Sequence, residues 1–255
     1  MVSEQIMRIL SECTTDGNVV RINSGQLDRK TYTEVNKVLE ALGGKWNRKL
    51  QGHICDHDPS DALAAVVSTG EVPDKNPLAF FPTDGAALER ILGAVMRYGV
   101  NNIRNILEPS AGDGAIVAEL RRHLPYDVTI TAVELDEHRA QTIRDRNLPN
   151  VEVITGDFLE WGSPDRYDVI AMNPPFRTAD RPLAYVDHIR HAHTMLAESG
   201  MLISVTPIGW QYAGNRRRLT EFREWVENDG WSIGLPDDAF KHAGTMVKTC
   251  LVMLD

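Results

Sequence analysis

From about residue 83 onward, short β-branched or apolar runs alternate with segments of helical periodicity, and this alternation constrains the fold more than any other feature. Such a pattern is typical of a parallel sheet covered by helices on both faces. The last two strand-like runs leave no room for a helix between them, so they should pair as an antiparallel hairpin at one edge of the sheet. The seven candidate strands are Asn105 to Glu108, Val128 to Glu134, Val151 to Thr155, Asp168 to Met172, Met201 to Thr206, Trp231 to Leu235 and Thr249 to Leu254.

The expected fold class is therefore α/β, with a Rossmann-like, seven-stranded, mostly parallel sheet. The first 75 residues differ, because an amphipathic helix from Asp28 to Leu42, a short strand-like run and a helix from Pro59 to Ser68 indicate a small α+β region. The stretch from Glu71 to Pro82 carries three prolines and is typical of a linker. We thus expect a small domain over residues 1–75 and a larger one over residues 76–255.

Charge and apolar content narrow the classes of function. No apolar run approaches the roughly 18 residues that a membrane-spanning helix needs, so we expect a soluble, cytoplasmic protein with no membrane contact. The three cysteines are not clustered, which argues against a disulfide framework. The net charge of -9 argues against unspecific polyanion binding, so any contact with nucleic acid should come from local basic patches.

The segment from Ile106 to Gly114 is a buried strand that runs into a glycine turn and then a helix. Gly112 and Gly114 allow the backbone to approach a ligand, and the helix beyond them offers free N–H groups at its start. A nicotinamide dinucleotide fingerprint would have a third glycine where Val117 stands. Alone, the segment is also compatible with an ordinary strand-to-helix turn.

Two further strand ends carry ligand-type side chains. Glu134 follows about twenty residues after the glycine turn, where a carboxylate can accept both hydroxyls of a ribose. Asp157 and Phe158 follow the third strand and offer a carboxylate and an aromatic face for an adenine. Glu134 could instead cap the next helix, but three such sites at successive strand ends match the rim where doubly wound sheets bind ligands.

The most informative motif is Asn173-Pro174-Pro175-Phe176, directly after the fourth strand. An exocyclic aromatic amine is a poor nucleophile because its lone pair is delocalised into the ring. The Asn173 side-chain oxygen and the Pro174 carbonyl are neutral acceptors that can draw the two amine hydrogens out of the ring plane. Phe176 can stack on the base, which offsets part of the cost of flipping it out of a duplex. The alternative is a rigid loop between strand and helix.

Over roughly residues 77–255 the chain resembles the class I S-adenosylmethionine-dependent methyltransferases. The NPPF motif, together with Phe81-Pro82-Thr83, resembles the gamma-class amino (adenine) DNA methyltransferases, and Leu235 to Phe240 with Gly244-Thr245 is similar to their closing hairpin. The resemblance implies S-adenosylmethionine as cofactor and a cofactor site that comprises Phe81, Pro82, Thr83, Glu108, Pro109, Ser110, Gly112, Gly114, Glu134, Leu135, Asp157, Phe158 and Asn173.

The implied activity is methylation of adenine in DNA, with Asn173, Pro174, Pro175 and Phe176 as catalytic residues. Similar tetrads also occur in enzymes that methylate guanine amines of ribosomal RNA or glutamine side chains, so an RNA or a protein amide remains an alternative substrate. A nucleic-acid-binding module without turnover is the other alternative, although such a module would need none of these residues.

The expected partner is double-stranded DNA, with RNA as the alternative. The strongest basic cluster is Lys45, Arg48 and Lys49 beside Trp46, and the further DNA contacts that we expect come from Arg177, Arg216 and Arg217. A solvated surface turn would explain these charges equally well. The chain stops soon after the last strand, where gamma-class enzymes usually carry a recognition domain, so we expect a short or relaxed target sequence.

His53, Cys55 and His57 alternate along a strand-like run. A trio of this kind lacks the fourth ligand and the paired spacing of a structural zinc site. We therefore expect no metal.

Overall fold

The computed structural model describes residues 2–55, 58–72, 83, 85–178, 180–212, 214, 216–236, 239–240 and 247–255. The chain divides into two compact units. The first comprises Met1–Pro77, Phe176–Leu183 and Pro207–Glu224, and the second comprises Leu78–Pro175, Ala184–Thr206 and Trp225–Asp255. Among the helices of the described residues, none has both the length and the apolar composition needed to cross a bilayer.

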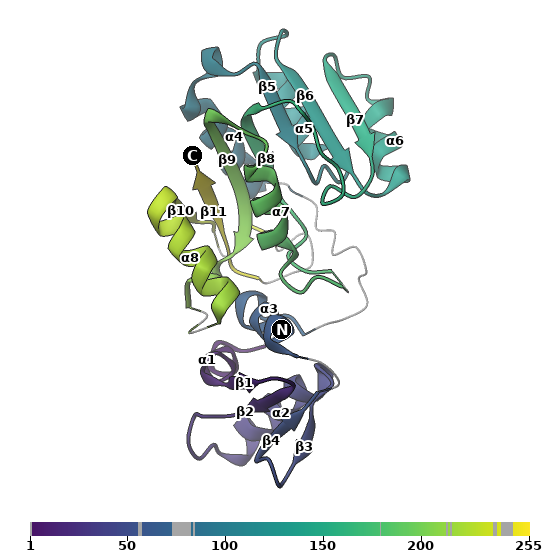
Figure 1. The fold of residues 1–255 in the computed structure, drawn as a ribbon. Coiled ribbons are helices and arrows are strands. Elements are labelled where there is room, and N and C mark those ends of the chain that lie inside the picture. Colours follow the sequence, from purple (N-terminus) through teal and green to yellow (C-terminus); the bar gives the residue numbers. More distant parts are fainter. Residues whose placement is uncertain are drawn as a thin grey trace. The chain divides into compact units, whose positions relative to one another are not determined.

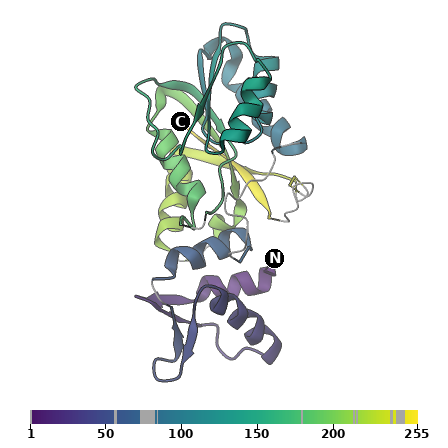
Figure 2. The same ribbon diagram turned by 90° about the vertical axis from the view of Figure 1, so that its right-hand side faces the viewer.

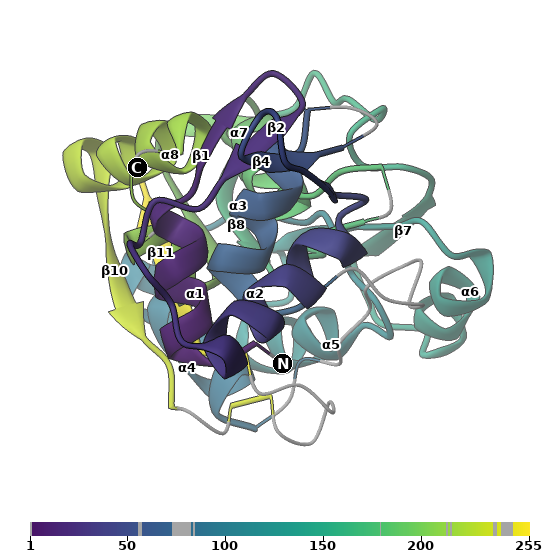
Figure 3. The same ribbon diagram turned by 90° about the horizontal axis from the view of Figure 1, so that it is seen from below.

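The first unit contains an antiparallel four-stranded sheet with strand order β1-β2-β4-β3 (Figure 1). Helices α1, α2 and α3 pack together beside it, as the view in Figure 3 shows. The small α+β region predicted at the N-terminus is therefore present. Its elements are α1 (Glu4–Glu12), β1 (Thr14–Asp16), β2 (Val19–Arg21), α2 (Arg29–Ala41), β3 (Lys45–Asn47), β4 (Gly52–Ile54), α3 (Ser60–Thr69) and the 3-10 turn η2 (Ile208–Tyr212).

Local signals in the sequence explain where these helices begin and end. The Asp28 carboxylate accepts hydrogen bonds from the backbone N–H groups of Lys30 and Thr31, so it caps α2, and its bond to the Thr31 hydroxyl contributes most to lowering its pKa. Helix α3 ends at Gly70, whose left-handed conformation suits glycine. The amphipathic pattern buries Val35, Val38 and Leu39 of α2.

The second unit contains a seven-stranded sheet with strand order β10-β11-β9-β8-β5-β6-β7 (Figure 1). Strand β5 pairs in parallel with β6 and β8, β6 pairs in parallel with β7, and β8 pairs in parallel with β9. Strands β10 and β11 form an antiparallel pair at one edge. The prediction of a mostly parallel, Rossmann-like sheet is confirmed. The strands are β5 (Asn105–Glu108), β6 (Thr129–Glu134), β7 (Val151–Thr155), β8 (Tyr167–Met172), β9 (Leu196–Pro207), β10 (Gly230–Gly234) and β11 (Thr249–Leu254).

Helices cover both faces of this sheet. Figure 2 shows α4 and α5, drawn in blue to teal, on one side of the sheet and the green α7 on the other. The central strands are almost completely buried, which is why their sequences are continuously apolar. The helical segments are α4 (Gly85–Gly99), the 3-10 turn η1 (Val100–Asn102), α5 (Ala115–His123), α6 (Glu137–Asp145) and α7 (Ala184–His193). Helix α8 (Arg217–Asp229) begins in the first unit and ends in the second, because the division between the units falls after Glu224.

Strand β9 begins earlier than the apolar pattern predicts, at Leu196 rather than at Met201. Tyr167 pairs with Leu196 and Val169 with Met201, so the two strands change register between these pairs. An added Cβ on Gly200 would lie 2.9 Å from the Tyr167 carbonyl oxygen. The polar residues in this irregular stretch interrupt the apolar run, which hid the start of the strand in the sequence.

Candidate active site

The candidate site is the edge of the large sheet at which parallel strands β5, β6, β7 and β8 end. Glu108, Glu134 and Met172 are the last residues of β5, β6 and β8. Strand β5 lies between β6 and β8, so the chain winds outward in both directions from it. This is the topological switch point at which open α/β sheets bind ligands.

Glu108 is fully buried at this edge. Its Oε1 accepts a hydrogen bond of 3.1 Å from the Ser110 backbone N–H, whereas its Oε2 has no hydrogen-bond partner among the described residues. Burial, opposed by the Ser110 bond and reinforced by the negative charge of Glu134, holds the pKa of the Glu108 carboxyl well above its ordinary range. The Ser110 hydroxyl is also buried without a partner, and Pro109 between them is buried. This cluster is ready to receive a cationic or hydrogen-bonding group.

The glycine turn after β5 needs its glycines for two physical reasons. Gly112 and Gly114 have φ angles of 57° and 83°, in the left-handed region that favours glycine. In addition, a Cβ on Gly114 would lie 2.8 Å from the Ile143 side chain of α6. The turn therefore combines tight packing with a helix start at Ala115 whose N–H groups are not capped by a side chain.

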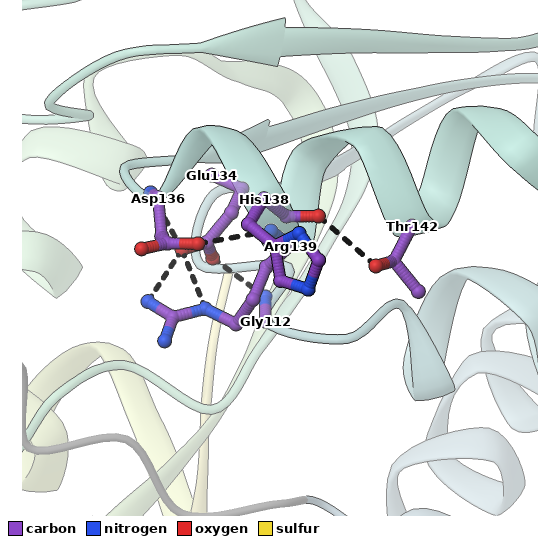
Figure 4. A network of polar contacts seen from close by, with 6 residues as sticks. All are labelled: Gly112, Glu134, Asp136, His138, Arg139 and Thr142. Atoms are coloured by element: carbon purple, nitrogen blue, oxygen red, sulfur yellow. Dashed lines mark hydrogen bonds and ion pairs between the residues drawn. The ribbon is translucent and has the colours of Figure 1, made fainter.

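Glu134 is the centre of the polar network in Figure 4. Its Oε2 accepts a 2.7 Å hydrogen bond from the Gly112 N–H, and its Oε1 accepts bonds from the Asp136 N–H and from Nε and Nη2 of Arg139, at 2.9, 2.9 and 2.7 Å. These four bonds match the capacity of a carboxylate. A ribose hydroxyl would therefore have to replace one of these donors. The donors from Gly112 and Asp136 are backbone N–H groups, whereas those from Arg139 belong to a side chain.

Arg139 was not identified from the sequence. It lies on α6, one turn after Asp136, whose side chain caps that helix by accepting from the Arg139 N–H at 2.9 Å. The signal that could have identified it is the spacing, because the arginine follows the glutamate at the strand end by five residues and lies in the first turn of the next helix. Leu135 between them is 54% exposed, so its apolar side chain is accessible at the same edge.

Asp157 and Phe158 follow β7, as the pattern predicted. The Asp157 Oδ1 accepts a 2.9 Å hydrogen bond from the Leu159 N–H. Phe158 is only 3% exposed, and its ring contacts His188 and His191 of α7 with centroid distances of 5.7 and 4.8 Å. The two histidines thus pack around Phe158. The stacking of Phe158 on an adenine stays a prediction.

Asn173 follows β8, and its side-chain Nδ2 donates a 2.9 Å hydrogen bond to the Thr83 hydroxyl. The two residues are far apart in sequence, and no local pattern indicated their contact. Pro174 is buried and Pro175 is partly buried. Phe81 and Pro82, predicted to close over the cofactor, lie outside the described residues, as do Gly244 and Thr245 of the predicted closing hairpin.

Phe176 and Arg177 belong to the first compact unit. Phe176 is 6% exposed, so a base could stack on it only after its surroundings rearrange. Arg177 donates a 3.0 Å hydrogen bond to the Val72 carbonyl and lies 3.9 Å from the Glu71 carboxylate. Within this unit, Arg177 therefore holds the segment that follows α3.

The predicted basic contacts differ in exposure. Lys45, Arg48 and Lys49 are exposed on the β3–β4 hairpin, together with Trp46, which packs edge-on against His53. Arg217 is exposed, with 85% of its side chain accessible.

Arg216, the other arginine predicted to contact DNA at this segment, is buried. It donates hydrogen bonds to the backbone carbonyls of Leu10 and Cys13, so it links segments inside the first unit and is not a surface cation. Burial raises the pKa of the neighbouring Cys13 thiol to about 11, so that thiol stays protonated. Arg216 therefore occupies a structural position in this unit.

The histidine and cysteine trio is described only in part, because His57 lies outside the described residues. His53 is buried, and its Nε2 forms a 2.7 Å hydrogen bond with Asn36. Burial lowers the pKa of His53, so the neutral ring is favoured. This hydrogen bond gives His53 a structural role.

A family model for the methyltransferase small domain matches residues 92–233, more than half of the chain. The chain is 28% identical over 160 residues to the tRNA1(Val) (adenine(37)-N6)-methyltransferase of Klebsiella pneumoniae (strain 342), covering 54% of this chain and 62% of that protein. It is 30% identical over 119 residues to the type II methyltransferase M.CvrRI of Paramecium bursaria Chlorella virus XZ-6E, covering 41% of this chain and 30% of that protein.

The chain thus spans less than two thirds of the length of either relative. Among solved structures, a Listeria monocytogenes protein described as a class I S-adenosylmethionine-dependent methyltransferase superposes with a TM-score of 0.52 at 15% identity. That alignment covers 71% of this chain and 62% of the other. This likeness supports the fold.

Proposed function

Because this chain belongs to the methyltransferase small domain family, we propose that it transfers a methyl group to the exocyclic amine of a flipped-out adenine in DNA. The cofactor is S-adenosylmethionine, the methyl donor of class I enzymes. The observation that carries the proposal is the position of Asn173 and Pro174, which follow β8 at the switch point of the sheet.

The residues at the end of β5 fit this cofactor. Glu108 Oε2 and the Ser110 hydroxyl are buried polar atoms without partners, and a methionine ammonium would satisfy them. The uncapped start of α5 after Gly112 and Gly114 suits the methionine carboxylate. Glu134 and Leu135 would hold the ribose, and Asp157 with Phe158 the adenine.

The chemistry required of the protein is orientation. The cofactor supplies an electrophilic methyl group on its sulfonium. Asn173 Oδ1 and the Pro174 carbonyl accept the two amine hydrogens, so the nitrogen lone pair turns out of the ring plane toward the methyl group. The methylated nitrogen then loses one proton to water, so no strong base is needed. Phe176 would stack on the base after a local rearrangement.

Adenine is the proposed base because the Klebsiella relative is named for transfer to N6 of an adenine. The viral type II methyltransferase supports DNA as the substrate. The Klebsiella enzyme, named for adenine 37 of a tRNA, favours a second candidate function, methylation of adenine in RNA. The chemistry at Asn173 and Pro174 would be the same for either nucleic acid.

Nucleic-acid contact is proposed for the β3–β4 hairpin. No aspartate or glutamate occurs between Ala41 and Cys55, whereas the whole chain has a net charge of -9. Lys45, Arg48 and Lys49 are all exposed there, which suits phosphate groups. Arg217 is a further exposed candidate, whereas Arg216 and Arg177 are engaged with backbone carbonyls.

A substrate panel tests the proposal. The full chain is incubated with S-adenosylmethionine carrying a labelled methyl group and, separately, with duplex DNA, tRNA, ribosomal RNA or protein extract. We expect label in DNA, recovered as N6-methyladenine after digestion to nucleosides. Label in RNA alone would move the function to the second candidate, and label in neither nucleic acid would overturn both.

Asn173→Ala is the matched variant for this panel. It should lose transfer by at least about 100-fold, a larger effect than any change in its affinity for S-adenosylmethionine, because one of the two acceptors for the amine is removed. Full activity in Asn173→Ala would refute the role of this side chain.

A further inference from the structure

The hydrogen bond between Asn173 and Thr83 links the strand-end motif to a residue that lies just before α4. Thr83 Oγ1 accepts from Asn173 Nδ2 at 2.9 Å, across a sequence separation of 90 residues. Thr83 is 8% exposed, so little water competes for its hydroxyl. Both residues belong to the same compact unit.

The bond has a direction that matters for the amide. An asparagine side chain has a donor end, Nδ2, and an acceptor end, Oδ1. Because Nδ2 donates to Thr83, Oδ1 points away from Thr83. Rotation of the amide by half a turn would instead present an NH₂ group to the adenine amine, and two donors cannot form the hydrogen bond that activates the nitrogen.

The two residues adjoin elements that pack together. Helix α4 packs against β8, Asn173 directly follows β8, and Thr83 lies two residues before the start of α4. A hydroxyl can accept from an amide Nδ2 or donate to an amide Oδ1. In the observed arrangement the Thr83 hydroxyl accepts from Nδ2, and this bond restricts rotation of the amide before the substrate binds.

We propose that Thr83 is a positioning residue that holds the Asn173 amide in the orientation in which Oδ1 accepts from the target amine. This inference deepens the proposed function and rests on it for its kinetic part. It assigns Thr83 a role in the transfer step that is separate from the cofactor contact suggested by sequence resemblance.

Three substitutions test this role. Thr83→Val keeps the shape of the side chain but removes the acceptor, so kcat should fall at least about 10-fold while the S-adenosylmethionine Kd stays within about twofold. Thr83→Ser keeps the hydroxyl and should restore most of kcat. Thr83→Ala also lacks the acceptor and serves if the valine variant does not fold.

A matched control is Thr129→Val. Thr129 donates to the Arg104 carbonyl and to Asn105 Oδ1 at the opposite end of β6, so its loss removes hydroxyl bonds far along the strand from the rim. It should leave kcat unchanged. Combining Thr83→Val with Asn173→Ala should cost no more than Asn173→Ala alone, because both changes disable the same acceptor.

Side-chain amide NMR separates this inference from the proposed function. The two Asn173 Nδ2 proton signals should shift and exchange faster with water in Thr83→Val than in the wild type or in Thr83→Ser. Unchanged amide signals, an unchanged kcat, or a loss of cofactor affinity that accounts for the whole defect would each overturn the positioning role. A wild-type protein that methylates no nucleic acid would overturn the proposed function, while the NMR result would still decide the contact.

Discussion

Glu108 has an unusual environment for a carboxyl side chain. Its carboxyl is fully buried with one unpartnered oxygen, and burial raises its pKa well above the ordinary range. Burial favours the neutral form of such an acid, and a bound cation would stabilise its charged form. The proposed methionine ammonium would be that cation.

The affinity for S-adenosylmethionine should therefore rise with pH. Binding favours the ionised carboxylate of Glu108, so it releases a proton wherever the free protein still holds one. The window begins near the ordinary carboxyl pKa of 4.5 and ends at the raised pKa of the free protein, above which affinity levels off. Calorimetric titration across this range, in buffers of different ionisation enthalpy, measures both the affinity and the released proton.

Glu108→Gln provides the control. It should bind the cofactor more weakly at neutral pH and show no such pH dependence. Its effect on stability has a fixed sign: because the folded pKa is raised, the unfolded chain ionises first, and the free energy of unfolding falls as pH rises through the window. Glu108→Gln should remove this fall. If the melting temperatures of the cofactor-free wild type and of cofactor-free Glu108→Gln declined equally with rising pH, the raised pKa could not be assigned to Glu108.

Two elements of the first unit, η2 and α3, lie so close together that only a glycine fits at their contact. A Cβ added to Gly209 would lie 2.3 Å from the Ser68 carbonyl oxygen and 2.4 Å from the Ser68 Cα. Both are backbone atoms, so no side-chain rotation relieves the clash. The contact joins segments more than 100 residues apart in the sequence.

Gly209→Ala should therefore destabilise the protein by about 1 to 3 kcal/mol, because overpacking forces the backbone to shift. Gly93→Ala is the matched control, since Gly93 lies inside α4 with nothing within 4 Å of an added Cβ. That change should stabilise by about 0.5 to 1 kcal/mol through higher helix propensity. Urea denaturation gives both values, and equal stabilities for the two variants would disprove the close contact.

The β3–β4 hairpin is the second element with a measurable consequence. The Asn47 side chain accepts from the Lys49 and Leu50 N–H groups, so the turn that carries the basic side chains has a defined shape. Neutralising its three cations should weaken DNA binding for every sequence and lower the slope of log affinity against log salt by about 2 to 3. The variant combines Lys45→Gln, Arg48→Gln and Lys49→Gln.

A charge-matched control replaces three exposed arginines elsewhere, Arg8, Arg97 and Arg122, by glutamine. The net charge changes equally, so long-range attraction weakens equally in both variants. Only the hairpin variant should lose the phosphate contacts. Identical salt slopes in a filter-binding or anisotropy series would rule out the hairpin as the contact.

At the scale of the whole molecule, the first compact unit is assembled from three separate parts of the chain. Arg216 bonds the Leu10 and Cys13 carbonyls, and Arg218 pairs with Asp61 at 2.7 Å. The segments 176–183 and 207–224 therefore depend on residues before 77 for their partners. The boundary predicted after residue 75 rests on the composition of the linker. It did not predict that residues 176–183 and 207–224 belong to the first unit.

A chain that begins at residue 78 should consequently be much less stable than the full chain. Each hydrogen bond lost from a charged group costs about 1.5 to 3 kcal/mol, and the buried Arg216 would lose both of its acceptors. Circular dichroism should show a lower and broader thermal transition. A fragment that melts as sharply as the full chain, at the same temperature, would show that these segments fold without the N-terminal residues.

Local patterns in the sequence were enough to predict the alternation of strands and helices, the glycine turn and the acidic strand ends, because these depend on neighbours within one turn or one strand. The predictions of the mostly parallel sheet and of S-adenosylmethionine as cofactor are confirmed. The individual site residues stay predictions.

The side chains that hold the site residues are apparent only in the folded chain. Thr83 forms a hydrogen bond with Asn173, and Arg139 forms hydrogen bonds with the Glu134 carboxylate. Histidines of α7 pack around Phe158. Contacts between segments far apart in sequence leave no periodic signal in either segment, since each side chain satisfies its local pattern whether or not its partner is present. The same reason explains why Arg216, surface-like in its basic run, is buried by residues two hundred positions away.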